Sequence, residues 1–401
     1  MSWPNRWVAK ATLWGASAVA SVFHLGMLAE SVADWHSAAP LRPLPPRRPH
    51  AGEDASLSGS PRVSVIIPAR DEERNIEACV TSLLAQDYDN FEVIVVDDGS
   101  TDATPTILAR LARTPEGQRR LRVARLEELP PGWAGKPHAL HAGTQIASGE
   151  WLLFTDADTR HMPTALRSAV TRALSEGADL FTIGTTQELP DFWNRTLMPI
   201  AYMGISAQYP PALVNNPRIP IAIANGQYLL IQRAMYERVG GYDTDELRAS
   251  VVDDLALARV VKRSGGRLRF VDGRGLVSVR MYHSLREHVN GWGKNAAAGS
   301  RGGAWLFPIF IVGLPVVTVW PFVALALGLL RRKPALAASG ATPVAAALAY
   351  RAYLDHQLGI PLRYGWTHPL GGAIFTFIIA RSFWRRLRGA TVPWRGRSYA
   401  A

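Results

Sequence analysis

The sequence predicts an α/β domain with a parallel sheet, placed between apolar membrane helices at the two ends of the chain. Short apolar runs at residues 63–67, 91–96 and 151–154 have the length of strands, and the first two are also rich in β-branched residues. Apolar residues recur at helical spacing over 75–86, between the first two runs. Strand, helix and strand in this order predict parallel pairing, and ligands of such sheets bind beyond the carboxyl ends of the strands.

The N-terminal part, residues 1–36, is expected to anchor the chain in a membrane. Residues 11–29 are mostly apolar, with His24 as their one potentially charged side chain, and can cross a bilayer core of about 30 Å. A cleaved signal peptide is the competing interpretation. Residues 37–60 are rich in proline and arginine, which predicts an extended linker with its cations facing anionic headgroups.

After the α/β domain, residues 61–282, the chain becomes apolar again. Residues 283–303 are predicted to form an interfacial helix, and residues 304–384 a C-terminal transmembrane region. The candidate spans in this region are residues 305–330, 335–354 and 369–379. The basic tail, residues 385–401, should be cytoplasmic. Three full spans would place this tail opposite the α/β domain, so a re-entrant segment is the open alternative.

The basic excess of the chain, 44 Lys and Arg against 33 Asp and Glu, lies largely beside the apolar runs. In a soluble protein this excess would suggest a nucleic-acid partner, but charge in these positions is typical of membrane-flanking segments. We therefore expect a multi-pass protein of the cell membrane that binds no nucleic acid. The single cysteine, Cys79, excludes an intrachain disulfide, and it fits a core position in a domain that faces the reducing cytoplasm.

Each predicted strand ends in acidic or turn-forming residues. The first runs into Pro-Ala-Arg-Asp-Glu-Glu at 68–73, the second into Asp-Asp-Gly-Ser-Thr-Asp at 97–102, and the third into Asp-Ala-Asp at 156–158. A parallel sheet brings these ends to one edge, where clustered carboxylates repel one another unless a cation is present. Hard oxygen ligands suit Mg²⁺ or Mn²⁺, which would bridge a substrate diphosphate and neutralise the leaving group.

The same acidic residues also have a purely structural interpretation. Residues 100–102 can cap the helix that follows them, and Asp158 can serve as a turn residue. We expect capping by residues 100–102 together with a substrate and metal site at Asp97, Asp98 and Asp158.

Taken together, the motifs make the chain resemble a family-2 inverting glycosyltransferase with the GT-A fold, a Rossmann-like nucleotide-sugar-binding domain. The motifs that carry this resemblance are residues 68–73, Asp97-Asp98-Gly-Ser, Gly135-Lys136, Asp156-Ala-Asp158, Gly240-Gly-Tyr-Asp243 and Asp253-Asp254. They occur in the expected order over about 60 per cent of the chain, which makes the resemblance more specific than any single motif.

The resemblance implies a role for each matching residue. Donor-binding roles fall to Pro68, Ala69, Arg70, Glu72, Asp97, Asp98, Lys136 and Asp156, and metal-binding roles to Asp158 and Asp156. The catalytic base would be Asp254, with Asp253 beside it. A physical argument also supports a donor-binding role for Lys136, because a lysine beside a glycine can approach a phosphate closely as a point charge.

Asp254 begins an amphipathic run that continues to residue 261, so we expect it at the N-terminus of a helix. The helix dipole there would keep the carboxylate ionised and able to accept the proton of an acceptor hydroxyl. The family usually has Glu-Asp at this point, and this chain departs from it at the first acid. Helix capping by Asp253 is compatible with a base at Asp254.

The segments around residues 279–282 and 290–295 narrow the resemblance further. The chain lacks the Gln-x-x-Arg-Trp motif of processive polysaccharide synthases, and it resembles the membrane-bound branch that glycosylates carotenoid, hopanoid or related lipids. Expected residues on the acceptor side are Gly226, Gln227, Trp292 and Lys294. For Trp292, membrane anchoring is an equal alternative.

The resemblance implies metal-dependent, inverting transfer from a nucleotide-diphosphate sugar, expected to be a UDP-sugar, to a lipid acceptor. A polysaccharide-synthase-like transferase is one alternative. A nucleotidyltransferase on a related fold is another, although it would be expected to carry a Gly-rich phosphate loop where residues 68–73 stand. A non-catalytic membrane scaffold is disfavoured because every expected acidic position is filled.

Overall fold

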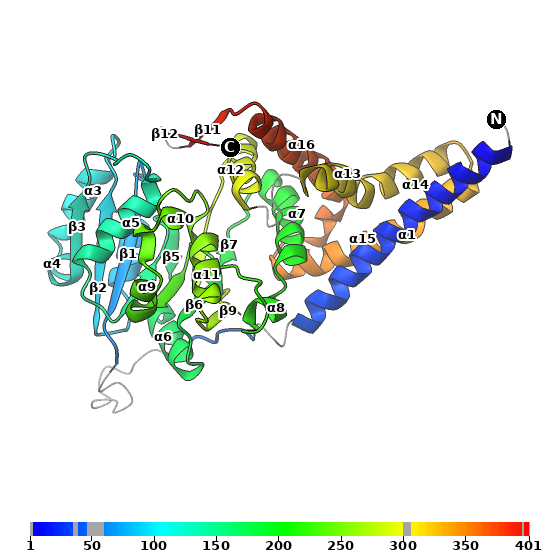
Figure 1. Cartoon of the computed structure of the whole chain (residues 1–401). Helices are drawn as coiled ribbons and strands as arrows, with labels where there is room; N and C mark the ends of the chain where they lie inside the picture. The colour runs from blue at the N-terminus through cyan, green and yellow to red at the C-terminus, as the bar shows by residue number, and fades with distance from the viewer. Residues whose placement is uncertain (1–2, 35–38, 46–59, 300–305, 395–396, 401) are drawn as a thin grey trace.

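The structure is a computed structural model that describes residues 3–34, 39–45, 60–299, 306–394 and 397–400. Its α/β domain and a group of long helices occupy opposite ends of the molecule (Figure 1). The helix α12 (Leu285–Gly299) lies between these two parts and corresponds to the predicted interfacial helix, of which residues 300–303 lie outside the described ranges.

A seven-stranded sheet in the order β3-β2-β1-β4-β8-β6-β9 forms the centre of the α/β domain. Its strands are β1 (Val63–Ala69), β2 (Phe91–Asp97), β3 (Leu121–Arg125), β4 (Trp151–Phe154), β6 (Leu180–Gly184), β8 (Leu229–Gln232) and β9 (Leu268–Asp272). The three predicted strands are β1, β2 and β4, and β1 pairs in parallel with both neighbours. Strand β8 runs antiparallel to β4 and β6, so the sheet is mixed where the sequence predicted a parallel one.

Helices cover both faces of this sheet because alternate residues of its central strands point to opposite sides. On one face Val65 and Ile67 pack with α2 (Ile76–Leu84), α3 (Thr104–Ala112) and α6 (Ala165–Ser175). On the other face Ile66 packs with α5 (Gly135–Ile146), α9 (Arg233–Arg238) and α11 (Asp253–Arg263). Cys79 of α2 is fully buried in the first core, as predicted.

The remaining elements of the domain are short or peripheral. They are β5 (Thr159–His161), β7 (Thr186–Gln187), β10 (Val277–Val279), α4 (Pro115–Arg120), α7 (Phe192–Gln208), α8 (Pro211–Asn215), α10 (Asp245–Arg248) and η1 (Gly241–Asp243). Strands β5, β10 and β7 form a second sheet in that order.

The helical part consists of α1, α13, α14, α15 and α16, followed by a small hairpin. Their bounds are α1 (Trp3–Asp34), α13 (Leu306–Thr318), α14 (Trp320–Leu330), α15 (Pro334–Gln357), η2 (Leu362–Thr367), α16 (His368–Leu387), β11 (Thr391–Trp394) and β12 (Arg397–Ala400). Helix α1 packs along α15, as does α14, whereas α16 packs against α13, α12 and α7 of the domain side.

Within the described residues, one helical segment, Ala11–Asp34, is by itself long and apolar enough to cross a membrane. This agrees with the predicted N-terminal anchor. The expected straight span over 305–330 is instead two helices bent by 41° at a break. Pro321, in the first turn of α14, has no N–H to continue the hydrogen-bond ladder of α13 across this break.

The other two expected C-terminal spans do not meet the same criterion of length and hydropathy. In α15, Arg351 and Asp355 form a fully buried ion pair with Nε and Oδ1 2.7 Å apart. Arg351 also donates to the carbonyl of Arg195 in α7. This helix is therefore held by polar contacts to the domain side, and three full C-terminal spans are not confirmed.

Part of the predicted linker packs on the α/β domain. The amide of Leu41 donates to the carbonyl of Asp272 at 2.7 Å, and the amide of Leu44 donates to Ser168 Oγ at 3.0 Å. Leu41 is also buried. Residues 39–45 therefore lie along the domain surface, while residues 46–59, with the remaining part of the linker, lie outside the described ranges.

Candidate active site

A cavity of about 730 Å³ opens at the carboxyl edge of the central sheet. Its walls come from the loops after β1, β2 and β4, the first turns of α5 and α11, and α12. The predicted residues that line it are Pro68, Ala69, Arg70, Glu72, Asp98, Lys136, Asp156, Asp158, Gly226, Gln227, Asp253, Asp254 and Lys294. The structure thus brings the strand-end acids and the start of α11 to one place.

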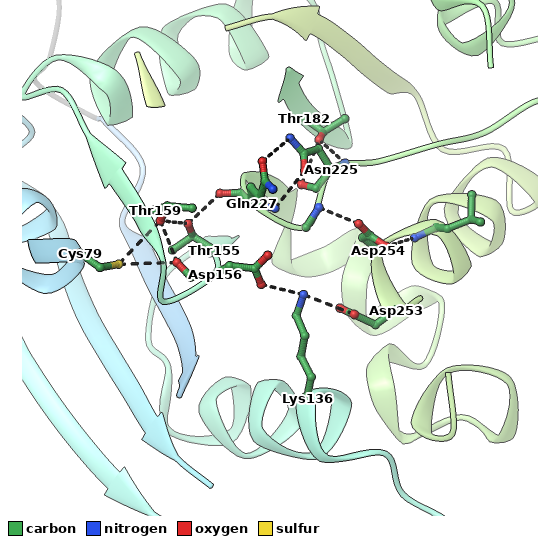
Figure 2. A network of polar contacts seen from close by, with 12 residues as sticks. Cys79, Lys136, Thr155, Asp156, Thr159, Thr182, Asn225, Gln227, Asp253 and Asp254 are labelled. Atoms are coloured by element: carbon green, nitrogen blue, oxygen red, sulfur yellow. Dashed lines mark hydrogen bonds and ion pairs between the residues drawn. The ribbon is translucent and has the colours of Figure 1, made fainter. Parts of the chain in front are cut away.

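Lys136 connects the two acidic sides of this cavity. Its Nζ lies 2.8 Å from Asp156 Oδ1 and 3.4 Å from Asp253 Oδ1, and Figure 2 shows the ammonium between these two carboxylates. Burial alone would lower the pKa of Lys136, but the charges of Asp156, Asp253 and Asp254 together outweigh burial and raise the pKa. The lysine is therefore a fixed positive charge within a carboxylate cluster.

Asp254 lies in the first turn of α11, as the sequence predicted, and both of its carboxylate oxygens are held. Oδ2 accepts from the amide of Gly226 and Oδ1 from the amide of Leu255, each at 2.8 Å. Gly226 allows this close approach, because an added Cβ would lie 3.0 Å from Lys136 Nζ and 3.1 Å from Asp254 Oδ2, and one of the two side chains would have to shift. This close approach fixes the direction in which the carboxylate points.

The pKa of Asp254 is shifted in the direction opposite to the one that the helix dipole favours. Burial first, and then the charge of Asp253, raise the pKa of Asp254 to about 6, although Lys136 and the two amide hydrogen bonds act in the opposite direction. The loss of hydration therefore outweighs the helix terminus. A carboxylate with a pKa near 6 is mostly ionised at neutral pH and is better matched to proton abstraction than an ordinary aspartate.

Asp253 does not cap α11, because the helix N-cap is Val252 and has no side-chain cap bond. Instead Asp253 Oδ1 faces Lys136, and Oδ2 accepts from the hydroxyl of Tyr242 at 3.3 Å. Tyr242 is fully buried after a turn in which Gly240 and Gly241 both have positive φ, 80° and 55°. The Gly-Gly-Tyr-Asp motif thus positions the tyrosine that holds Asp253.

The turn after β4 carries Asp156 and Asp158 into the cavity. Thr155 Oγ1 donates to the carbonyl of Gln227 at 2.7 Å, and Thr159 Oγ1 donates to the carbonyl of Asp156 at 2.8 Å (Figure 2). Asp158 lies close enough to Tyr282 to affect it electrostatically: the pKa of Tyr282 is raised by burial first and by the charge of Asp158 second. The hydroxyl groups of Thr155 and Thr159 therefore hold this acidic turn in place.

No group of three or more His, Cys, Asp and Glu side chains in the described ranges is close enough to hold a metal ion alone. This does not argue against a divalent cation, because Mg²⁺ sites commonly use one or two carboxylates and complete the shell with substrate phosphates and water. Asp156 and Asp158, two residues apart on one turn and lining one cavity, fit that kind of site.

The loop after β1 is tied to the loop after β2 by reciprocal hydrogen bonds. The amide of Glu73 donates to Asp102 Oδ2 at 2.9 Å, and the amide of Thr101 donates to Asp71 Oδ1 at 2.8 Å. Asp102 Oδ1 also accepts from the amide of Thr104, the first residue of α3. The N-cap of α3 is Ala103, which has no side-chain cap bond, so the expected capping by residues 100–102 is wrong. Asp102 makes one bond to the start of the helix, and Ser100 and Thr101 bind the neighbouring loop.

Asp98, and not Asp97, faces the cavity. Asp97 is 1% exposed; its Oδ1 accepts from the amide of Ser100 and its Oδ2 from Arg125 Nη1, both at 2.9 Å. It is absent from the cavity lining described above. Arg70 Nη1 donates to the carbonyl of Asp98 at 2.6 Å, which keeps both residues at the donor side of the cavity.

Of the expected acceptor-side residues, Lys294 of α12 lines the cavity, and burial followed by the charge of Lys136 lowers its pKa to about 8. Gln227 also lines the cavity, but its Oε1 accepts from Thr185 Oγ1. Trp292 does not line it; its ring packs between Tyr282 and Phe375, with centroids 6.1 Å and 5.8 Å away. Trp292 joins α12 to α16.

Sequence reasoning missed several residues of the cavity wall. After strand β10 the wall is formed by Arg280, Met281, Tyr282 and His283, and on α12 by Glu287 and Asn295. The sequence signals for this side were the motifs over residues 279–282 and 290–295, because no strand-end acid marks it.

Comparisons with known proteins agree with this geometry. Residues 64–240 match the model of the family described as Glycosyl transferase family 2. A 4,4'-diaponeurosporenoate glycosyltransferase of Staphylococcus aureus strain USA300 is 26% identical over 355 residues, which are 84% of this chain and 88% of that protein. Its counterpart in strain MRSA252 is 24% identical over 356 residues, with the same coverage.

Among solved structures, the chain is similar to a mannosyltransferase from Pyrobaculum calidifontis in complex with GDP-Man and Mn²⁺. The TM-score is 0.53 at 21% identity, and the match covers 93% of this chain and 99% of that one. This likeness shows a GT-A fold, in agreement with the mixed sheet. Residues 64–240 therefore form a domain of glycosyl transferase family 2, and the protein is a glycosyltransferase.

Proposed function

We propose that the protein transfers a sugar, with inversion at the anomeric carbon, from a nucleotide-diphosphate sugar to a lipid-type acceptor at the membrane. One observation carries the proposal: Asp254 faces the same cavity as Asp156 and Asp158, with Lys136 between the two sides. In-line displacement needs a base on the acceptor side and positive charge on the leaving-group side, and this cavity has both.

The donor is proposed to lie against the ends of β1, β2 and β4. Pro68, Ala69 and Arg70 would contact the nucleoside with Asp98, since these residues line the cavity there. The resemblance of the motifs to the family favours uridine as the nucleoside of the donor. Glu72 supports the loop, because its Oε2 accepts from Asn75 Nδ2 at 3.1 Å.

Asp158 and Asp156 would hold Mg²⁺ or Mn²⁺ together with the diphosphate. Bound there, the ion would supply charge neutralisation for the departing nucleoside diphosphate. Lys136 adds a second positive charge beside Asp156, at a position that does not depend on the ion. Its ammonium is held by two carboxylates, so little reorganisation is needed when negative charge develops on the leaving group.

Asp254 is proposed as the base that takes the proton of the acceptor hydroxyl. Its two amide hydrogen bonds hold the carboxylate in place, and the raised pKa strengthens it as a base while leaving it ionised at neutral pH. Asp253 acts on the reaction through Lys136 and keeps the ammonium on the donor side.

The acceptor is proposed to be a carotenoid-type or related lipid that approaches along α12. The staphylococcal relative is a 4,4'-diaponeurosporenoate glycosyltransferase that aligns with 84% of this chain, which supports a lipid-type acceptor. Lys294 and Asn295 of α12 line the cavity on the side where the helical part begins. The candidate span in α1 supports a location in the cell membrane, with the catalytic domain proposed to face the cytoplasm.

Incubating the purified full chain with a panel of nucleotide sugars and bacterial lipid extracts tests this function. We expect one nucleotide sugar to be consumed, with a glycolipid whose anomeric configuration, read by NMR, is opposite to that of the donor. Retained configuration would refute the inverting mechanism. Transfer to a soluble sugar polymer but to no lipid would favour the polysaccharide-synthase alternative.

A further inference from the structure

A second hollow, which we call the arginine groove, lies between α12 and α16 and is separate from the catalytic cavity. It has a volume of about 600 Å³ and is lined by Leu285, Arg286, Val289, Asn290, Arg381 and Arg385. The two helices lie side by side at the junction of the α/β domain and the helical part (Figure 1). None of these residues has a role in the proposed sugar transfer.

The charge of the groove is uncompensated. In the part of the chain that the structure describes, no carboxylate lines it, and Arg286, Arg381 and Arg385 form no ion pair. Arg381 and Arg385 are four residues apart on α16, so their like charges lie on one helical face, which is unfavourable unless an anion binds. Among the residues that the structure describes, the polar partner of these arginines in the groove is Asn290, whose Oδ1 accepts from Arg381 Nη1 at 3.3 Å.

The surroundings of the groove indicate where the anion comes from. Leu285 and Val289 give it an apolar wall, and Phe377, Trp384 and Leu387 of α16 are exposed apolar side chains close by in sequence. Arginines beside exposed apolar side chains are typical of a surface that inserts into the headgroup region of a membrane. A soluble phosphate would use the guanidinium groups but would leave the apolar side chains without a partner.

We propose that the arginine groove binds the phosphate headgroup of an anionic membrane lipid. Planar guanidinium groups suit phosphate oxygens, which they can bind in bidentate fashion. The opposite side of α12 lines the catalytic cavity through Glu287 and Lys294, so the bound lipid would hold this helix, and the mouth of the cavity, at headgroup depth.

Native mass spectrometry of the full chain, purified in mixed micelles of phosphatidylglycerol and phosphatidylcholine, tests the proposal. We expect the parent protein to retain phosphatidylglycerol selectively. Asn290→Asp has nearly the same shape and keeps the acceptor for Arg381, but it places a carboxylate in the groove, so retention should fall about tenfold or more. Arg381→Gln combined with Arg385→Gln should have the same effect.

The matched control is Arg331→Gln combined with Lys333→Gln, which removes two exposed charges between α14 and α15 and should leave retention unchanged. Equal retention of both lipids by the parent protein, or normal retention by Asn290→Asp, would overturn the proposal. Displacement of the lipid by excess inorganic phosphate would show that free phosphate is the ligand, and would overturn the lipid assignment.

Discussion

Replacing Asp254 by asparagine should stabilise the folded protein while it removes the proposed base. In the folded protein the pKa of Asp254 rises from its ordinary 3.8 to about 6 because of burial and the neighbouring Asp253. One pKa unit corresponds to about 1.4 kcal/mol, so ionised Asp254 costs the folded state about 3 kcal/mol at neutral pH. Asparagine is neutral and avoids this cost.

The substitution also removes one hydrogen-bond acceptor from the site. Asp254 accepts one amide hydrogen bond on each oxygen, from Gly226 and Leu255, whereas asparagine has a single acceptor oxygen. Leaving one buried amide without an acceptor costs about 1–2 kcal/mol. The net gain should therefore be about 1–2 kcal/mol, or a rise in Tm of about 2–8 °C for a domain of this size.

The dependence of this gain on pH distinguishes it from a general packing effect. Because the pKa of Asp254 is raised in the folded state, the cost of ionisation is absent below about pH 4 and is fully present above pH 6. The Tm difference between Asp254→Asn and the parent should thus be positive and largest at pH 7, and it should shrink and then reverse as the pH falls toward 4, where only the lost hydrogen bond remains.

Scanning fluorimetry of the full chain in detergent, without donor or metal, measures this difference. Asp243→Asn is the matched control, because Asp243 is an exposed aspartate only eleven positions earlier in the chain. A lower Tm for Asp254→Asn at pH 7.5, or a Tm difference that does not change with pH, would refute the electrostatic reasoning.

Three further predictions concern catalysis. The value of kcat/KM should fall below about pH 6 as Asp254 is protonated. In Lys136→Met the midpoint of this fall should move to higher pH, because the charge of Lys136 lowers the pKa of Asp254. A pH–rate profile whose midpoint does not move in Lys136→Met would count against this assignment. Excess chelator should abolish transfer, Mg²⁺ or Mn²⁺ should restore it, and Asp158→Ala should stay inactive at any metal concentration; full activity in chelator would exclude the metal. Gly226→Ala should reduce kcat about tenfold or more, because its Cβ would displace Lys136 or Asp254. Gly204→Ala is its control, since a Cβ there meets nothing within 4 Å; equal loss in both variants would remove the steric argument.

The features that the sequence predicted correctly depend on local pattern. The short apolar runs became β1, β2 and β4, and the amphipathic run after residue 253 became α11. Because parallel strands share an edge, the acids that follow β1, β2 and β4 were expected to meet, and Asp98, Asp156 and Asp158 do line one cavity. The period of apolar residues and the chain direction are enough for such conclusions.

The features that could not be predicted from the sequence depend on contacts between residues that are distant in the chain. Asp97 turns inward because Arg125 of β3 pairs with it, and the sequence around Asp97 does not predict this partner. Trp292 packs inside because Phe375 of α16 lies opposite it. The raised pKa of Asp254 likewise follows from burial against other elements, whereas the dipole argument considered only its own helix.

Antiparallel β8 and the broken α13–α14 pair were missed for a similar reason. Neither strand direction nor a bend of 41° can be read from an apolar run alone. Proline at the start of α14 was a signal for the break, but its effect depends on whether neighbouring helices supply the missing contacts.

The central claim, that Asp254 is the base for sugar transfer, is tested most directly by measuring donor binding and transfer together in Asp254→Asn. If Asp254 is the base, the nucleotide-sugar Kd should stay close to that of the parent protein while turnover falls about 10²- to 10⁴-fold. Near-normal turnover at normal donor affinity would contradict it, and would remove Asp254 from the mechanism.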